Sequence, residues 1–124
     1  MSQQFAFWRT KKRLDSRKVF ERLMSGKSVR GLDKLDLDQI ENALIAAFSD
    51  WNVETRRTPD NPQTMLDQGE NGGGLDIGYT PQSVTVTCYH TGEKEWNEII
   101  EVMAELKLPL YDPQINERFD SVSL

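Results

Sequence analysis

The sequence has one cysteine and one histidine, Cys88 and His90, in 124 residues. These counts exclude an internal disulfide, a multi-cysteine zinc site and a histidine-rich metal site. No apolar run approaches the ~18 residues that a membrane-spanning helix needs. The N-terminal MSQQFAFWRTKKR places its charges after a short apolar stretch, the reverse of a secretory signal. We therefore expect a cytoplasmic protein without metal, cofactor or membrane contact.

Length and composition favour one folded unit. At 14.3 kDa and 37% hydrophobic residues, the chain has enough apolar surface for one core. It shows no internal repeat and no domain linker. Residues 1–124 are thus predicted to form a single domain.

Charge is distributed unevenly along the chain. Residues 1–31 hold nine basic and two acidic side chains, a net of +7, whereas the remainder carries a net of −12. Such a division is typical of a basic arm for nucleic acid or of an acidic face for a basic protein partner. It also occurs where two faces of a protein neutralise each other and in surfaces that are merely solvated.

Apolar residues at helical spacing predict three helices. Asp15 is a candidate N-cap for the first, which should stop at Gly26. Asp36 and Gln39 match a capping box before the second, and Pro109 should end the third. The three ranges are about 16–25, 37–50 and 93–107.

Alternating residues predict about four strands, and two of them should form a hairpin through Pro81. The polar stretch 59–74 is predicted to be a long flexible loop, because it combines turn residues with no periodic apolar positions. The expected fold is α+β, an antiparallel sheet of about four strands packed by two or three helices in the order β-α-α-β-β-β-α. The strand ranges are about 4–9, 51–58, 75–80 and 83–90.

The sequence contains no complete catalytic set. Cys88 and His90 are two apart on a predicted strand, on the same face as Val84 and Val86, which favours a place in the core over a nucleophile and its base. Carboxylates are numerous, but none is marked by an apolar environment. No catalytic residue and no metal ligand is predicted.

Two acidic segments are candidates for partner binding. One lies on the predicted last helix, opposite its apolar stripe, and the other lies in the predicted loop. A solvated helix face and a simple connector are the alternatives. The candidate residues are Asp60, Asp67, Glu70, Glu98, Glu101 and Glu105.

The C-terminal part contains LPLYDPQ at 108–114 and ERF at 117–119, and the N-terminal strand contains FAFW at 5–8. With the early helix, these segments resemble the small immunity proteins encoded beside toxins of contact-dependent inhibition and related polymorphic toxin systems in bacteria. The resemblance covers about a quarter of the chain. It implies a non-catalytic cytoplasmic inhibitor that binds one toxin domain, and no catalytic residue is carried over from it.

The tail also has a purely structural interpretation. Leu108, Leu110 and Tyr111 are expected to pack beside the core, and Phe119 is expected to pin the end of segment 108–124.

Together with the resemblance to immunity proteins, the acidic part of the chain after residue 31 and the missing catalytic set predict a protein that binds and neutralises a cognate toxin domain, which we expect to be a basic nuclease. We expect no small-molecule substrate, and the oligomeric state is left open. The alternative is a nucleic-acid-binding or assembly module that uses the basic N-terminal segment. We regard nucleic acid as the weaker candidate, because Trp8 is the one aromatic in that segment whose side chain is a candidate for stacking on bases.

Overall fold

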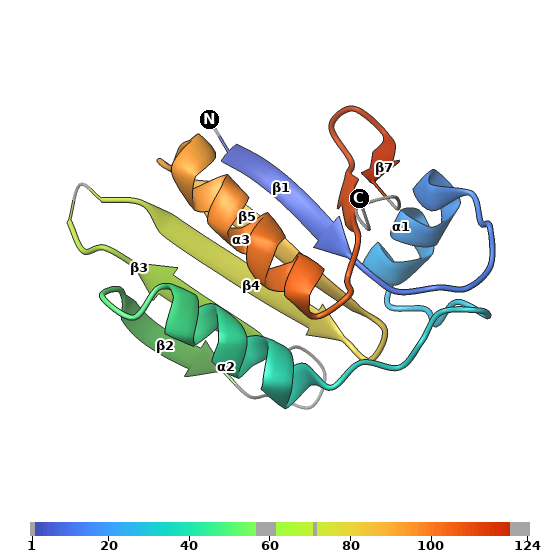
Figure 1. Cartoon of the computed structure of the whole chain (residues 1–124), viewed down its shortest axis with the longest axis horizontal. Coiled ribbons are helices and arrows are strands. Elements are labelled where there is room, and N and C mark those ends of the chain that lie inside the picture. The colour runs from blue at the N-terminus through green and yellow to red at the C-terminus, as the bar shows by residue number, and fades with distance from the viewer. Residues whose placement is uncertain (1, 57–61, 71, 120–124) are drawn as a thin grey trace.

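The computed structural model describes residues 2–56, 62–70 and 72–119. These residues form three helices and one antiparallel sheet of seven strands, shown in Figure 1. The α+β class is confirmed. The helices are α1 (Ser16–Met24), α2 (Leu37–Ala47) and α3 (Glu93–Glu105). The strands are β1 (Ser2–Phe7), β2 (Asn52–Arg56), β3 (Gln63–Asp67), β4 (Gly74–Thr80), β5 (Ser83–Tyr89), β6 (Leu110–Asp112) and β7 (Glu117–Phe119).

The strands follow one another across the sheet in the order β2-β3-β4-β5-β1-β6-β7. The N-terminal strand is therefore internal, pairing with β5 on one side and β6 on the other. The predicted hairpin is confirmed, with Thr80 opposite Ser83 and Pro81 in the turn between β4 and β5. Figure 1 shows α2 and α3 lying across the same face of the sheet.

The prediction of about four strands was wrong, first because the predicted loop 59–74 contains β3. This strand pairs with both β2 and β4, and its Thr64 and Leu66 are buried. Gln63, Met65 and Asp67 alternate with them, but the polar composition of the segment concealed that two-residue period. Residues 59–61 and 71 of the segment lie outside the described part.

Two further strands lie in the C-terminal segment, so the order is β-α-α-β-β-β-β-α-β-β. Leu110 and Tyr111 of β6 pair with β1, and both side chains are buried, as is Leu108. The expectation that these three residues pack on the core is confirmed. Phe119 is 40% exposed, so it does not pin the tail as predicted.

The helix ends follow local hydrogen bonding. Asp15 Oδ1 accepts from the backbone N–H of Lys18 at the start of α1, as predicted for its cap. Asp36 does the same for α2, which ends at Ala47, earlier than the expected residue 50. Helix α3 ends before Pro109 because Lys107 adopts a left-handed backbone with φ of 61°.

The sheet has apolar contacts on both faces, because alternate residues of β1 point in opposite directions. Phe5 and Phe7 lie in the main core, beneath α2 and α3, whereas Ala6 and Trp8 belong to a second core with α1. Trp8, the candidate for stacking on bases, is 1% exposed, so its ring is not accessible for that contact. None of the helices in the described part is long and apolar enough to cross a membrane.

Candidate partner-binding surface

Three of the predicted contact residues form an exposed acidic ridge on α3. Ile99 and Met103 of this helix are buried in the main core. The ridge residues occupy the opposite face and all three side chains are exposed, as the helical spacing predicted. The acidic ridge consists of Glu98, Glu101 and Glu105.

Two other predicted contacts lie where β3 turns into β4. Asp67 is exposed, and its Oδ1 accepts hydrogen bonds from Asn52 Nδ2 at 3.2 Å and from the Gly69 N–H at 2.8 Å. These two donors hold the carboxylate at the base of the turn. Glu70 is exposed in the turn. Asp60, the remaining predicted contact, lies outside the described residues.

The β3–β4 turn packs against the segment that leads into α3. At Gly73, an added Cβ would lie 2.9 Å from Thr91 Cγ2 and 3.0 Å from the His90 carbonyl oxygen, so the backbones approach closely there. Gln68 closes the turn, since its Oε1 accepts from the Gly73 N–H at 2.9 Å. The turn acids are thereby brought to the end of the molecule at which α3 begins.

A groove at this end joins the turn to the ridge. Its volume is about 240 Å³, and both Gln68 and Glu98 line it. Trp51 is half-buried, with its ring centroid 5.0 Å from that of Phe48 in an edge-on arrangement. The groove therefore offers an aromatic wall beside carboxylates. The lining residues are Ala47, Phe48, Ser49, Asp50, Trp51, Gln68, Lys94, Glu95 and Glu98.

The first turn of α3 is held in place by side chains. The Gly92 N–H donates to Glu95 Oε1 at 3.0 Å, and Trp96 Nε1 donates to Thr91 Oγ1 at 2.9 Å. Side chains that are already held by hydrogen bonds lose little further conformational entropy when a partner binds. The groove edge formed by this turn is accordingly preorganised.

Asp50, Trp51 and Glu95 were not among the predicted contacts. Trp51 was assigned to the apolar stripe of the second helix, but α2 ends at Ala47 and leaves Trp51 half-exposed beyond it. In the sequence, an aromatic residue next to an acidic one at a helix end was the pattern that could have indicated this site. That pattern indicates a groove only when α3 and the β3–β4 turn lie beside it, which the sequence does not show.

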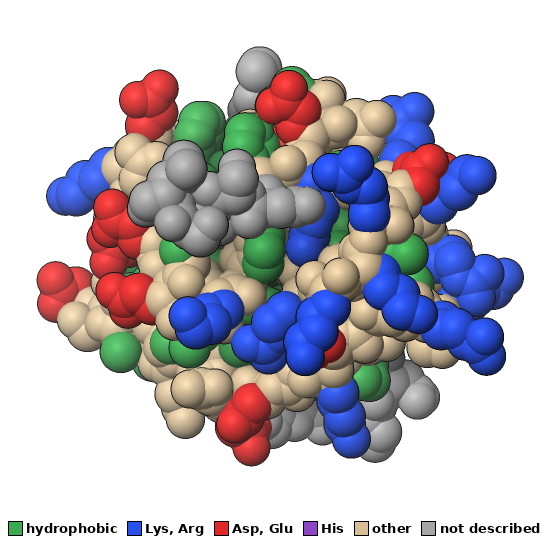
Figure 2. Space-filling model, turned by 45° about the vertical axis from the view of Figure 1, so that its right-hand side comes forward, with side chains coloured by type: hydrophobic (Ala, Val, Ile, Leu, Met, Phe, Trp, Pro, Cys, Tyr) green, Lys and Arg blue, Asp and Glu red, His purple; other side chains and the backbone are tan. Residues whose placement is uncertain are grey.

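The charge division of the sequence is also a division in space. Figure 2 shows lysine and arginine side chains gathered over the centre and right of the view, with most of the visible acidic side chains toward the left. Fields from grouped charges of one sign add, whereas interspersed charges cancel. The molecule therefore presents surfaces of opposite sign to charged partners.

Cys88 and His90 do not form a nucleophile and base. Cys88 is buried, and burial raises the pKa of its thiol to about 11, with a smaller opposing effect from a hydrogen bond with Thr91. A thiol with this pKa is almost fully protonated at neutral pH and is a poor nucleophile. His90 was predicted on the core face, but β5 ends at Tyr89, and His90 is exposed with φ of 51°. That prediction was wrong, because the left-handed residue turns the chain out of the strand.

One polar cluster lies inside the main core. The Thr64 hydroxyl donates to Glu41 Oε2, and its oxygen lies 2.9 Å from Tyr79 Oη. These contacts connect α2 to β3 and β4, which satisfies buried polar groups and fixes the helix on the sheet. Among the described residues, no group of three or more histidine, cysteine, aspartate or glutamate side chains is placed to hold a metal ion.

Comparison with known protein families finds no matching family model, and comparison with curated proteins finds no match.

Proposed function

We propose that this chain is a non-catalytic cytoplasmic protein that binds and neutralises a toxin domain with a basic surface, such as a nuclease. The observation that carries the proposal is the convergence of the acidic ridge, the β3–β4 turn and the groove at Trp51. The resemblance of the tail to immunity proteins supports the same class of partner.

The groove suits a lysine or arginine side chain of the partner. Its volume of about 240 Å³ accommodates such a chain, and the Trp51 ring offers a face for the aliphatic stem or the guanidinium. Asp50 and Glu98, both exposed, are placed to meet the cationic end. Lys94 also lines the groove, so the attraction of these carboxylates must exceed its repulsion of the incoming cation.

The acidic side chains of the ridge and the turn contribute to binding through their combined electrostatic field. An exposed ion pair contributes only about 0.2–1 kcal/mol. Several acids on one surface nevertheless accelerate encounter with a basic partner and orient it. A nuclease surface that grips phosphate has the matching sign, so covering it blocks the active site.

The proposal is tested by charge reversal on the ridge. The double variant Glu98→Lys/Glu101→Lys is expected to weaken binding to the toxin domain encoded beside this gene by about tenfold or more, because attraction becomes repulsion. Calorimetric titration measures the affinity, and growth of cells expressing that domain measures protection.

The matched control is Glu21→Lys/Glu117→Lys. It makes the same change in net charge at exposed residues outside the ridge and the groove. It should protect like the wild type. Equal binding by the ridge variant and the wild type would refute the binding surface, and the lack of any growth-inhibiting partner would refute the immunity function.

The alternative, a nucleic-acid-binding or assembly module, draws on the exposed basic side chains around α1 in Figure 2. Burial of Trp8 removes the aromatic that was a candidate for stacking on bases in this segment. The basic surface therefore supports contacts to phosphate more readily than recognition of bases.

A further inference from the structure

A second cavity lies on the basic side of the molecule, next to the start of α1. Its volume is about 260 Å³, and its walls come from three separate segments: residues 8–16, the start of the tail at Pro109, and β7. We name it the Trp8 pocket. Its lining residues are Trp8, Thr10, Lys11, Lys12, Arg13, Leu14, Ser16, Pro109 and Arg118.

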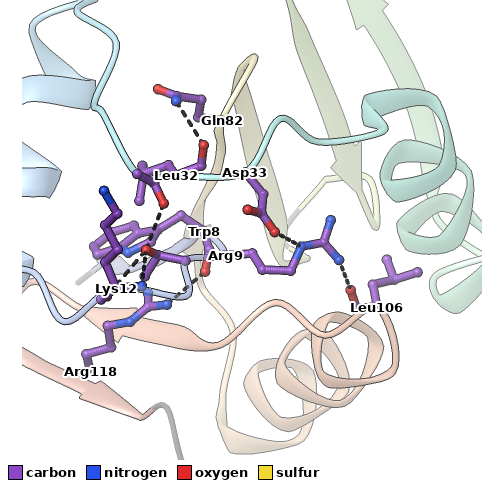
Figure 3. A network of polar contacts seen from close by, with 10 residues as sticks. Trp8, Arg9, Lys12, Leu32, Asp33, Gln82, Leu106 and Arg118 are labelled. Carbon is purple, nitrogen blue, oxygen red and sulfur yellow. Dashed lines mark hydrogen bonds and ion pairs between the residues drawn. The ribbon is translucent and has the colours of Figure 1, made fainter.

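Arg118 is fixed in one orientation at this pocket. Its Nη2 donates to the Trp8 carbonyl oxygen at 3.0 Å, as Figure 3 shows, and its guanidinium carbon lies 4.6 Å from the centroid of the Trp8 ring. Pairing of Arg118 with Tyr111 between β7 and β6 places the side chain over that ring. A guanidinium held by stacking and hydrogen bonding loses little entropy when a ligand binds.

Four cationic side chains line the pocket, and none of the described residues that line it carries a carboxylate. Within the described part of the chain, Lys11, Lys12 and Arg13 form no ion pair, and Asp33 pairs instead with Arg9, at 3.2 Å. The nearby Asp15 carboxylate is directed to the helix, accepting from the Lys18 N–H. Among the described residues, Lys11, Lys12 and Arg13 thus have no ion-pair partner, and a bound anion would relieve the repulsion between them.

The segment that carries these cations is anchored to the rest of the fold. Thr10 Oγ1 donates to the Gly31 carbonyl oxygen at 2.8 Å, and the Asp33 N–H donates to the Arg9 carbonyl oxygen at 2.8 Å. Arg9 also donates to the Leu106 carbonyl oxygen at the end of α3, which is visible in Figure 3. The pocket thus belongs to a fixed backbone, as a binding site requires.

We infer that the Trp8 pocket binds the phosphate group of a phosphate ester. A phosphate dianion matches several converging cations, and a guanidinium presents its N–H groups in a geometry that suits phosphate oxygens. Ser16 adds a hydroxyl donor at the pocket. The volume leaves room for part of the esterified group. This inference is independent of the proposed toxin binding, which uses the acidic side.

The test is an NMR titration of the full chain with adenosine monophosphate, at ionic strength held constant with chloride. Saturable shifts are expected for the amides of residues 10–16 and for the Trp8 indole. The variant Lys11→Gln/Arg13→Gln should weaken binding by about tenfold or more, because two charge-assisted contacts are lost. The control Lys18→Gln/Arg30→Gln removes equal charge from exposed residues outside the pocket and should change affinity by less than about twofold.

A short RNA oligonucleotide distinguishes the source of the phosphate. If the oligonucleotide binds at the same residues about tenfold more tightly than the mononucleotide, the ligand is a nucleic acid strand. If it binds equally or more weakly, the ligand is a small phosphate ester. The inference would be overturned if adenosine monophosphate caused no saturable shifts, or if both double variants lost the same affinity for it. It would also be overturned if a glutamate-rich peptide bound as tightly as adenosine monophosphate. Failure here leaves the toxin-binding proposal standing, because the Lys11/Arg13 variant retains the acidic ridge.

Discussion

Cys88 lies in β5 with its thiol inside the main core, at 1% exposure. Its neighbours in the sheet are Gln3 in β1 and Leu75 in β4, so the residue lies in an internal strand, and its side chain packs in the core on one face of the sheet. Ionisation there requires placing a charge in an apolar environment, which explains the raised pKa of about 11. The residue therefore serves packing.

Replacing Cys88 with alanine should lower the free energy of unfolding by about 1 kcal/mol at pH 7, as expected for a small cavity. In the wild type, stability should then fall as pH rises from ~8.5, where an unfolded thiol ionises, to about 11, because the unfolded state releases its proton first. Urea denaturation from pH 7 to 11 measures both effects. The alanine variant lacks the thiol contribution, so the difference between the two proteins should shrink; a constant difference would contradict the raised pKa.

The β3–β4 hairpin shows how one element brings the candidate surface together. Its turn is closed by Gln68 and Gly73 and lies against Thr91, immediately before α3. Gly73 has backbone and side-chain atoms within about 3 Å of where a Cβ would stand, whereas Gly78 in β4 has nothing within 4 Å. The same substitution therefore has different consequences at the two positions.

Gly73→Ala is expected to displace the turn from α3 and to destabilise the protein by about 1–3 kcal/mol, as overpacking does. Gly78→Ala should change stability by less than about 0.5 kcal/mol. Thermal unfolding of both variants compares the two costs, and amide shifts near Thr91 report the displacement. Equal stability of the two variants would show that the turn does not pack tightly on α3.

Taken as a whole, the molecule separates its charges. The basic side chains around α1 and the acidic ridge on α3 come from different parts of the sequence and are all exposed. Figure 2 shows basic side chains gathered over the centre and right of the view and most of the visible acidic ones toward the left. A net charge of −5 therefore understates the field that a partner meets at either surface.

Association with a basic toxin domain should consequently slow as salt rises. Between about 0.01 and 0.15 M ionic strength the Debye length falls from ~30 to ~8 Å, so long-range attraction is largely screened. Stopped-flow measurement should show the association rate constant falling steeply and the dissociation rate constant changing little. An association rate indifferent to salt would exclude electrostatic steering.

Local patterns in the sequence were sufficient for the three helices and for the β4–β5 hairpin. Their apolar spacing, the caps at Asp15 and Asp36 and the turn at Pro81 act between near neighbours in the chain. The exposure of the acidic ridge followed from the same spacing, since a helix that buries Ile99 and Met103 must present its opposite face.

Long-range contacts determined the remainder. Strand β3 forms because β2 and β4 supply hydrogen bonds on both its edges, and the three-residue strands β6 and β7 exist because β1 leaves an edge to pair with. Trp8 is buried because the tail and α1 close over it. The groove at Trp51 and the Trp8 pocket each combine segments far apart in the sequence, and local spacing carries no information about which of those segments meet.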